Sequence, residues 1–240
     1  MSSVSCGFGI GPPPGAEAGQ VIVVTDVEMS VKRAGLGILA AAAGAVVFAT
    51  AAMPAAAGLS DPNPIVPQVP CYPDCQGADL RGRNAEYAQM PDGNFNEANL
   101  RAVDWIRANL SGSTFVNTNM YKAGLYGVDL TNADLSGADA SKVSFAKANL
   151  TSADLSGADV SKANLRNANL TGANLTGADL SKANLKGANL TNADLSGVNF
   201  YKANFKDANL TGADITGADF RRAKFKNTIC PNGTKTNKGC

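Results

Sequence analysis

The sequence predicts an all-β solenoid in which the chain turns once every five residues and stacks upon itself. Counting in steps of five from Leu80 to Phe225 gives thirty positions without an insertion, and every occupant is apolar. Ala stands two residues before most of these positions, and Asn or Asp stands one residue before 25 of the 30. Gly and Asn recur two residues after them, where a corner requires a permissive backbone.

A period of five excludes the ordinary regular elements. In a helix a step of five advances about 500°, so successive apolar residues would lie about 140° apart and form no stripe. In a flat strand an odd period sends alternate apolar residues to opposite faces. A chain that turns once per repeat brings every apolar residue to one interior, and a fixed short period is typical of solenoids.

The run ANLTGANLTGADL at residues 168–180 resembles the pentapeptide-repeat family, whose motif is A(D/N)LXX. The resemblance covers Ala78 to Lys226. It implies a right-handed quadrilateral β-helix of about seven to eight coils, with four repeats per coil, the central residue and the Ala inside and the other three positions outside. The sequence departs from the motif early in the run, so the motif alone does not determine the coil geometry there. The departures from Ala or Asn/Asp are Arg83, Gln89, Ser113, Thr114 and Gly124.

Four repeats per coil would stack residues that are 20 apart, about 4.8 Å from one another. Leu150, Leu170 and Leu190 would then be vertical neighbours in one interior column. A core filled by such columns leaves no room for an internal ligand, so we expect no cofactor.

The first 57 residues form a predicted targeting region. Within it, residues 30–57 have the layout of an export signal: Lys32-Arg33, an uncharged apolar stretch, and small residues at Ala55–Ala57. The alternative is a retained membrane anchor, because the uncharged stretch is long enough to span a bilayer. A signal that begins about thirty residues in indicates two successive targeting steps into a thylakoid, whereas a start at Met29 would indicate a bacterial periplasm.

Three further regions follow the targeting region. Residues 58–77 form a Pro-rich N-terminal cap, residues 78–227 the β-helix, and residues 228–240 a C-terminal cap bounded by Cys. Both caps would cover solenoid ends that otherwise pair with other edges.

Four cysteines remain after signal removal, and their even number in an exported chain predicts disulfides. Three connectivities are possible. The length of the rod argues against bridges between its ends and favours Cys71–Cys75 and Cys230–Cys240. These bridges either pin the caps or act as accessible redox switches. A zinc site of four thiolates would require both ends to meet, so no metal site is expected.

Charged residues form columns at a spacing of 20. One cationic column is a candidate docking stripe for an acidic protein surface or for anionic headgroups, the alternative being a solvated face. Acidic residues fall on other columns, and Asp139 and Asp159 are expected to pair with Lys142 and Lys162 around a corner. The candidate docking stripe consists of Lys122, Lys142, Lys162, Lys182, Lys202 and Arg222.

These features predict a non-enzymatic scaffold or assembly protein. The absence of His removes Ser-His-Asp chemistry and His-containing metal sites, and no nucleophile, base and orienting group converge. The C-terminal CPNGT…C segment, with the export signal and the repeat, resembles thylakoid lumenal pentapeptide-repeat proteins, which implies a small soluble lumenal protein with disulfide-bearing termini. We expect protein partners, with photosynthetic complexes at the lumenal side as candidates, and at most peripheral membrane contact. The alternative is a DNA-mimicking topoisomerase-binding protein, but repeats with 17 Lys and Arg against 15 Asp and Glu are poorly suited to DNA mimicry, and no nucleic acid is expected as a partner.

Overall fold

The computed structural model describes residues 69–240, so the predicted targeting region and most of the Pro-rich cap lie outside the described residues. Within residues 69–240, no helix is long and apolar enough to cross a membrane.

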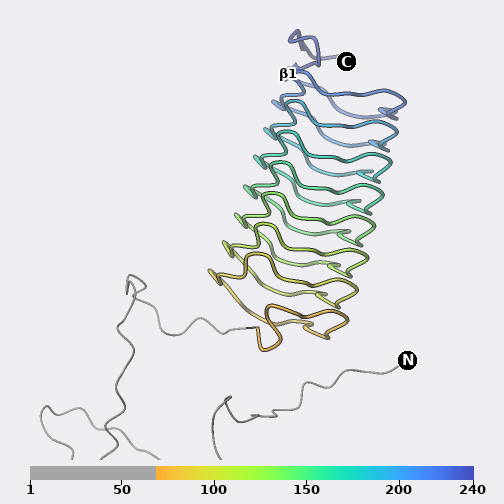
Figure 1. The fold of residues 1–240 in the computed structure, drawn as a ribbon. Helices are drawn as coiled ribbons and strands as arrows, with labels where there is room; N and C mark the ends of the chain where they lie inside the picture. The colour runs from red at the N-terminus through yellow and green to blue at the C-terminus, as the bar shows by residue number, and fades with distance from the viewer. Residues whose placement is uncertain (1–68) are drawn as a thin grey trace, which may run out of the picture. The chain divides into compact units, whose positions relative to one another are not determined.

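The described chain winds into a four-sided β-helix in which each residue stacks on the residue 20 positions later (Figure 1). Parallel single-residue bridges join successive coils without interruption, from Asp74↔Asn94 to Asn209↔Ile229. Leu170 donates its amide N–H to the carbonyl of Asn189 at 2.7 Å, and Asn189 donates to Ala168 at 2.9 Å. The prediction of a quadrilateral β-helix with four repeats per coil is therefore confirmed.

Each side of a coil contributes only one bridged residue, because a turn interrupts the extended chain after every repeat. The only named strands of the described chain are therefore in the C-terminal cap, where β1 (Thr228–Ile229) pairs antiparallel with β2 (Lys235–Thr236).

The corners of the coil require a left-handed backbone. From Gly77 to Asn227, the residue two positions after each core residue has a φ between 53° and 70°. Gly adopts this conformation freely and Asn tolerates it, whereas a longer side chain pays a conformational penalty. Lys nevertheless occupies several of these corners, although the backbone conformation does not favour it there.

The interior is filled by side chains stacked one coil above another. Leu150, Leu170 and Leu190 are completely buried. Aromatic rings occupy two sections of the core: Phe95 stacks on Phe115 with centroids 5.1 Å apart, and Phe205 stacks on Phe225 at 5.4 Å. The expectation of a filled core agrees with this packing.

The departures from the motif leave the coil unbroken, so the geometry that the motif left open is the regular one. Ser113 takes an interior Ala position, where its hydroxyl accepts from the N–H of Gly93 and donates to the carbonyl of Met90, both at 3.0 Å. Thr118 donates to the carbonyl of Phe95 at 2.7 Å. A buried hydroxyl that reaches the backbone of the preceding coil has no unpaired polar atom, so the interior accepts it.

The two ends of the β-helix differ in how well they are covered. At the N-terminal end Val69 is buried, and the Tyr72 hydroxyl donates to the carbonyl of Pro91 at 2.7 Å. At the C-terminal end Ile215, Phe220 and Phe225 are only partly buried. The C-terminal cap therefore covers its end of the solenoid only in part.

Candidate functional site

The four long faces of the solenoid are numbered here by their central core residues. Face 1 contains the repeats centred on residue 180 and every 20th residue from it, and faces 2, 3 and 4 contain those centred on 185, 190 and 195 and their 20-residue equivalents. Each face exposes the residue before its core residue and the two residues after it.

Charge is strongly segregated among these faces. Between residues 78 and 226, all 17 Lys and Arg belong to repeats of faces 1 and 2, together with eight of the 15 acidic residues. Faces 3 and 4 carry no cation over the same range. Their seven acidic residues are Asp92, Glu97, Asp129, Asp134, Asp154, Asp194 and Asp214. The solenoid therefore has a basic long side and an acidic long side, although its net charge is close to zero.

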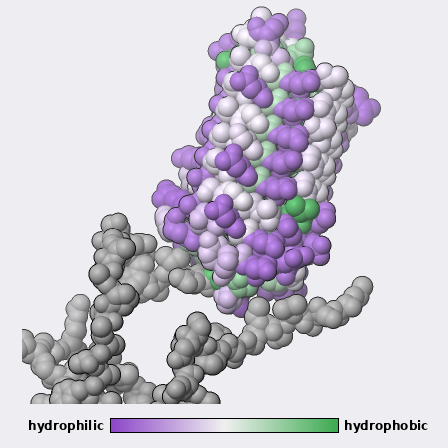
Figure 2. Space-filling view, viewed as in Figure 1, coloured by the Kyte–Doolittle hydropathy of each residue, from purple (hydrophilic) through white to green (hydrophobic). Residues whose placement is uncertain are grey.

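The predicted docking stripe lies along the corner between faces 1 and 2. We call it the lysine stripe; its members, each exposed and each with a φ of 59° to 62°, are Lys122, Lys142, Lys162, Lys182, Lys202 and Arg222. Backbone hydrogen bonds hold these corners, as where Lys162 donates its amide to the carbonyl of Ser181 at 2.9 Å. Figure 2 shows hydrophilic side chains in rows along the solenoid. The stripe is thus a row of cations on a rigid backbone.

Two tyrosines contact the stripe near its ends. Lys142 donates to the Tyr121 hydroxyl at 2.7 Å and lies 4.8 Å from the ring centroid, and Lys202 lies 5.0 Å from the ring of Tyr201. The hydrogen bond from Lys142, with the nearby charge of Lys122, holds the pKa of the Tyr121 hydroxyl below its usual range. Sequence columns give no sign of these contacts, because Tyr appears only twice in its column.

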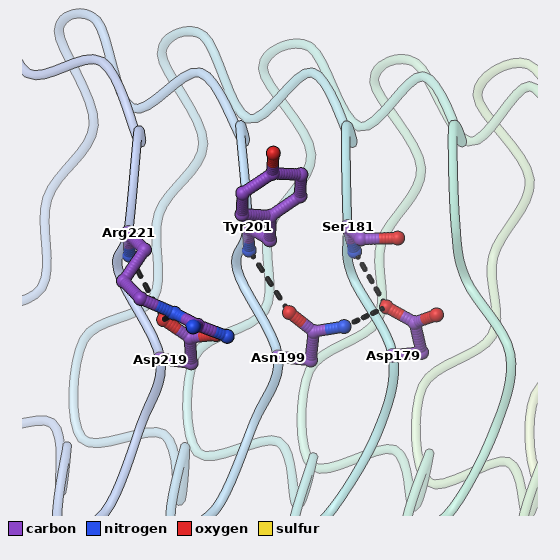
Figure 3. Close-up of polar contacts among 6 residues, drawn as sticks. All are labelled: Asp179, Ser181, Asn199, Tyr201, Asp219 and Arg221. Atoms are coloured by element: carbon purple, nitrogen blue, oxygen red, sulfur yellow. Dashed lines mark hydrogen bonds and ion pairs between the residues drawn. The ribbon is translucent and has the colours of Figure 1, made fainter.

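The expected pairing of Asp139 with Lys142 and of Asp159 with Lys162 is wrong. Each carboxylate instead accepts the backbone N–H of the residue two positions later, as Asp139 does from Ser141 at 3.0 Å. Figure 3 shows this arrangement on face 1, where Asp179 accepts from Ser181 at 2.8 Å and from Asn199 at 2.9 Å. Among residues 69–240 the ion pairs are Arg81–Asp79 and Arg221–Asp219, so no ammonium group of the lysine stripe is neutralised by an ion pair there.

A second cationic row runs along the far edge of face 2. It consists of Arg166, Lys186, Lys206 and Lys226, which we call the second stripe. Between the two stripes lie Asn164, Asn184 and Asn204, whose side-chain oxygens accept the backbone N–H groups of Arg166, Lys186 and Lys206 at 3.2–3.3 Å. From residue 162 to residue 206, face 2 is therefore an amide floor between two basic borders, and in the last coil Lys224 takes the floor position.

Faces 3 and 4 are neutral to acidic and densely hydrogen-bonded. On face 3, Thr171 donates to Asn169 at 2.7 Å and accepts from Asn189 at 2.9 Å, and the pattern repeats in neighbouring coils. On face 4, hydrogen bonds from the hydroxyl and backbone of Ser196 lower the pKa of Asp194, and those from Thr216 lower the pKa of Asp214. These carboxylates are held in their charged form, which is unsuited to general-acid chemistry near neutral pH.

No group of three or more potential metal-ligand side chains gathers among residues 69–240. A hollow in the C-terminal cap is lined by Ile215, Pro231, Thr234, Lys235 and the Cys230–Cys240 pair.

The predicted cysteine pairs lie close enough for disulfides. The Cα atoms are 5.0 Å apart for Cys71 and Cys75, and 5.3 Å apart for Cys230 and Cys240, within the range of such bonds. Cys75 and Cys230 also fall on the five-residue register, and both are buried. Each pair therefore joins the outermost core residue to a cap, whereas the oxidation state in the cell stays a prediction.

Comparison with known proteins identifies the repeat. A family model described as pentapeptide repeats matches in eight copies, within residues 94–132, 129–167, 163–200 and 188–227. No curated protein is significantly similar to the chain.

Several solved structures are similar. One is HetL, a pentapeptide repeat protein involved in heterocyst differentiation regulation from the cyanobacterium Nostoc sp. strain PCC 7120, with 27% identity over 66% of this chain and 91% of HetL, at a TM-score of 0.35. A pentapeptide repeat protein of the Arabidopsis thaliana thylakoid lumen is 28% identical over 50% of this chain and 69% of its own, at a TM-score of 0.20. QnrB1, a plasmid-mediated fluoroquinolone resistance protein, is 20% identical over 61% and 90%, at a TM-score of 0.42.

Proposed function

The chain belongs to the pentapeptide repeat family, and we propose that it is a non-enzymatic scaffold of the thylakoid lumen that binds protein partners through its long faces. The proposed scaffold is a rod of about seven to eight coils. Its interior is closed by stacked side chains such as Leu170, so only the surface is available for recognition.

The observation that carries this proposal is the segregation of charge. All 17 cations of the repeats lie on two adjacent faces, and the opposite two carry none. A solvated surface needs only enough mixed charge for solubility. Separate basic and acidic sides, by contrast, give a protein two surfaces that attract different partners and orient them.

The lumenal location is supported by the sequence. The export-signal layout at residues 30–57 and the cysteine-bounded C-terminal segment agree with an oxidising compartment outside the cytoplasm. A bacterial periplasm is the alternative location.

Topoisomerase binding by DNA mimicry is less well supported. At a coil spacing of about 4.8 Å, seven to eight coils make a rod of about 35 Å. Duplex DNA carries one negative charge per about 1.7 Å, so a mimic of that length would need roughly 20 negative charges. The acidic side has seven.

The proposal is tested with photo-crosslinking in intact thylakoids. A crosslinking amino acid is introduced at one equivalent position on each of faces 1 to 4, with Asn232 in the terminal loop as the control position. The four positions are Ser181, Lys186, Thr191 and Ser196. We expect specific protein adducts from at least one face and none from the loop. The absence of adducts from every face, or fractionation of the protein outside the thylakoid, would refute the proposal.

A further inference from the structure

We propose that face 2 binds an acidic α-helix of a partner protein, laid along the rod between the lysine stripe and the second stripe. This inference rests on the proposed scaffold function and specifies one of its partners. It concerns the part of face 2 from residue 162 to residue 226.

The first argument is the cost of the lysine stripe. Its six members stand at left-handed corners, where Gly is free of strain. The equivalent corner of face 4 is Gly in five consecutive coils, from Gly137 to Gly217. The same fold therefore accommodates Gly at such corners, and six consecutive cations persist against the backbone preference.

The second argument is the missing counterion. Lys162 and Lys182 form no ion pair within residues 69–240. In the nearest acidic column, on face 1, Asp159 and Asp179 each turn one carboxylate oxygen to a backbone N–H group instead. Stacked cations about one coil apart repel one another. A row of carboxylates from a partner relieves this repulsion, so the unpaired cations of the unbound protein favour binding.

The third argument is the fit of a helix. Lys182 and Lys186 are separated by four residues, at most about 13 Å of extended chain, and an α-helix with its side chains is about 10–12 Å across. Carboxylates at positions i and i+4 of a helix are about 5–6 Å apart, close to the 4.8 Å spacing of coils. A helix with Glu on both flanks can therefore reach both stripes over several coils.

The floor between the stripes also selects against other anions. Asn164, Asn184 and Asn204 are polar, and the exposed large hydrophobic side chains of the described chain, Tyr72 and Tyr87, lie in the first coils. Membrane insertion needs apolar or aromatic anchors, and single-stranded nucleic acid needs aromatic platforms for its bases. Neither is present on this part of face 2, which leaves a protein carboxylate array as the best match.

The test measures binding of a fluorescein-labelled Ala/Glu helix to the full chain by fluorescence anisotropy. A peptide of about 14 residues, about 21 Å long as a helix, covers the three coil steps from Lys162 to Arg222 with room at both ends. Glu is placed on its two flanks at i,i+4 spacing. The control peptides have every Glu replaced by Gln, or the same Glu residues distributed evenly around the helix.

Two protein variants with equal charge change provide the specificity test. The stripe variant carries Lys162→Asn, Lys182→Asn and Lys186→Asn, and the control variant carries Arg83→Asn, Arg101→Asn and Arg107→Asn. Asn already occupies left-handed corners of this fold, at Asn132, Asn167 and Asn192, so both variants are expected to fold; circular dichroism checks this.

We expect the flank-Glu helix to bind the natural chain, the stripe variant to bind at least about tenfold more weakly, and the control variant to change less than about twofold. Equal weakening in both variants, no binding of the helix, or tighter binding of a single-stranded DNA oligonucleotide or of anionic vesicles would overturn the proposal. Crosslinked partners on another face, together with no binding of the helix, would refute this inference alone and leave the scaffold function intact.

Discussion

Truncation of one central core residue tests the physical basis of the whole rod. Leu170 is completely buried, and its column neighbours Leu150 and Leu190 are held one coil away by backbone hydrogen bonds. Leu→Ala substitutions in cores cost about 2–5 kcal/mol, and the cost rises when the surroundings cannot collapse into the cavity. The ladder fixes the coil spacing on both sides of Leu170. We therefore expect Leu170→Ala to lower the free energy of unfolding by about 3–5 kcal/mol.

The measurement is equilibrium unfolding in guanidinium chloride, followed by circular dichroism, on natural and variant chains. Solenoids can unfold in segments, so native-state hydrogen exchange of the amides of Asn169 and Asn189 supplies a local readout. Leu170→Met conserves volume and serves as the matched control, with an expected cost below about 1.5 kcal/mol. A loss below about 1 kcal/mol for Leu170→Ala, or equal losses for both variants, would contradict a filled and rigid core.

Three further predictions concern the corners, the carboxylates and the C-terminal cap. Lys162→Gly should raise stability by up to about 1 kcal/mol relative to Lys162→Ala, because only Gly relieves the left-handed strain, and thermal unfolding of the two variants measures the difference. Folding lowers the pKa values of Asp194 and Asp214, so the charged carboxylates stabilise the folded chain. This contribution is complete above the unfolded pKa of about 3.9 and is lost as the pH falls through the lower folded values. Unfolding curves should therefore coincide from pH 8 to pH 5 and shift to lower stability below about pH 4, whereas a marked change near pH 6.5 would contradict this. Cys240→Ser should release the cap at a cost of about 2–3 kcal/mol, seen as faster amide exchange around Ile229 with little change at Leu170, whereas uniform loss along the rod would show that the cap governs global stability.

Most of the fold was predictable because one geometric constraint repeats. Every coil has four identical steps, so the apolar register from Leu80 to Phe225 determines which residues are inside and which residue stacks on which. The motif alone did not determine the coil near Ser113, for a local reason. The motif gives Ala as the usual residue at this interior position. The coil also accepts Ser113 there, because its hydroxyl donates to the carbonyl of Met90 in the preceding coil.

The candidate site was less predictable. The lysine stripe followed from the spacing of 20, but the side-chain partners did not, because Lys142 reaches Tyr121 rather than Asp139. The segregation of charge was present in the sequence and becomes visible when all columns are sorted by sign. Extension of the register by one step in each direction would likewise have placed Cys75 and Cys230 in the core.

The rigidity of the rod also bears on how its basic face can recognise a partner. Cations on flexible loops would adapt to many anions, and each would lose conformational freedom on binding. Here the backbone of the five lysines of the stripe is fixed by hydrogen bonds between coils, as for Lys162 and Lys182, which donate to Ser181 and Tyr201. Binding therefore has to order only the lysine side chains, because the backbone conformational entropy is already lost when the chain folds. A surface of this kind gains affinity only for anions that match its spacing, and rejects those that do not. Selectivity would then come from the backbone ladder itself, the same feature that allows the corner side chains to vary without disturbing the core.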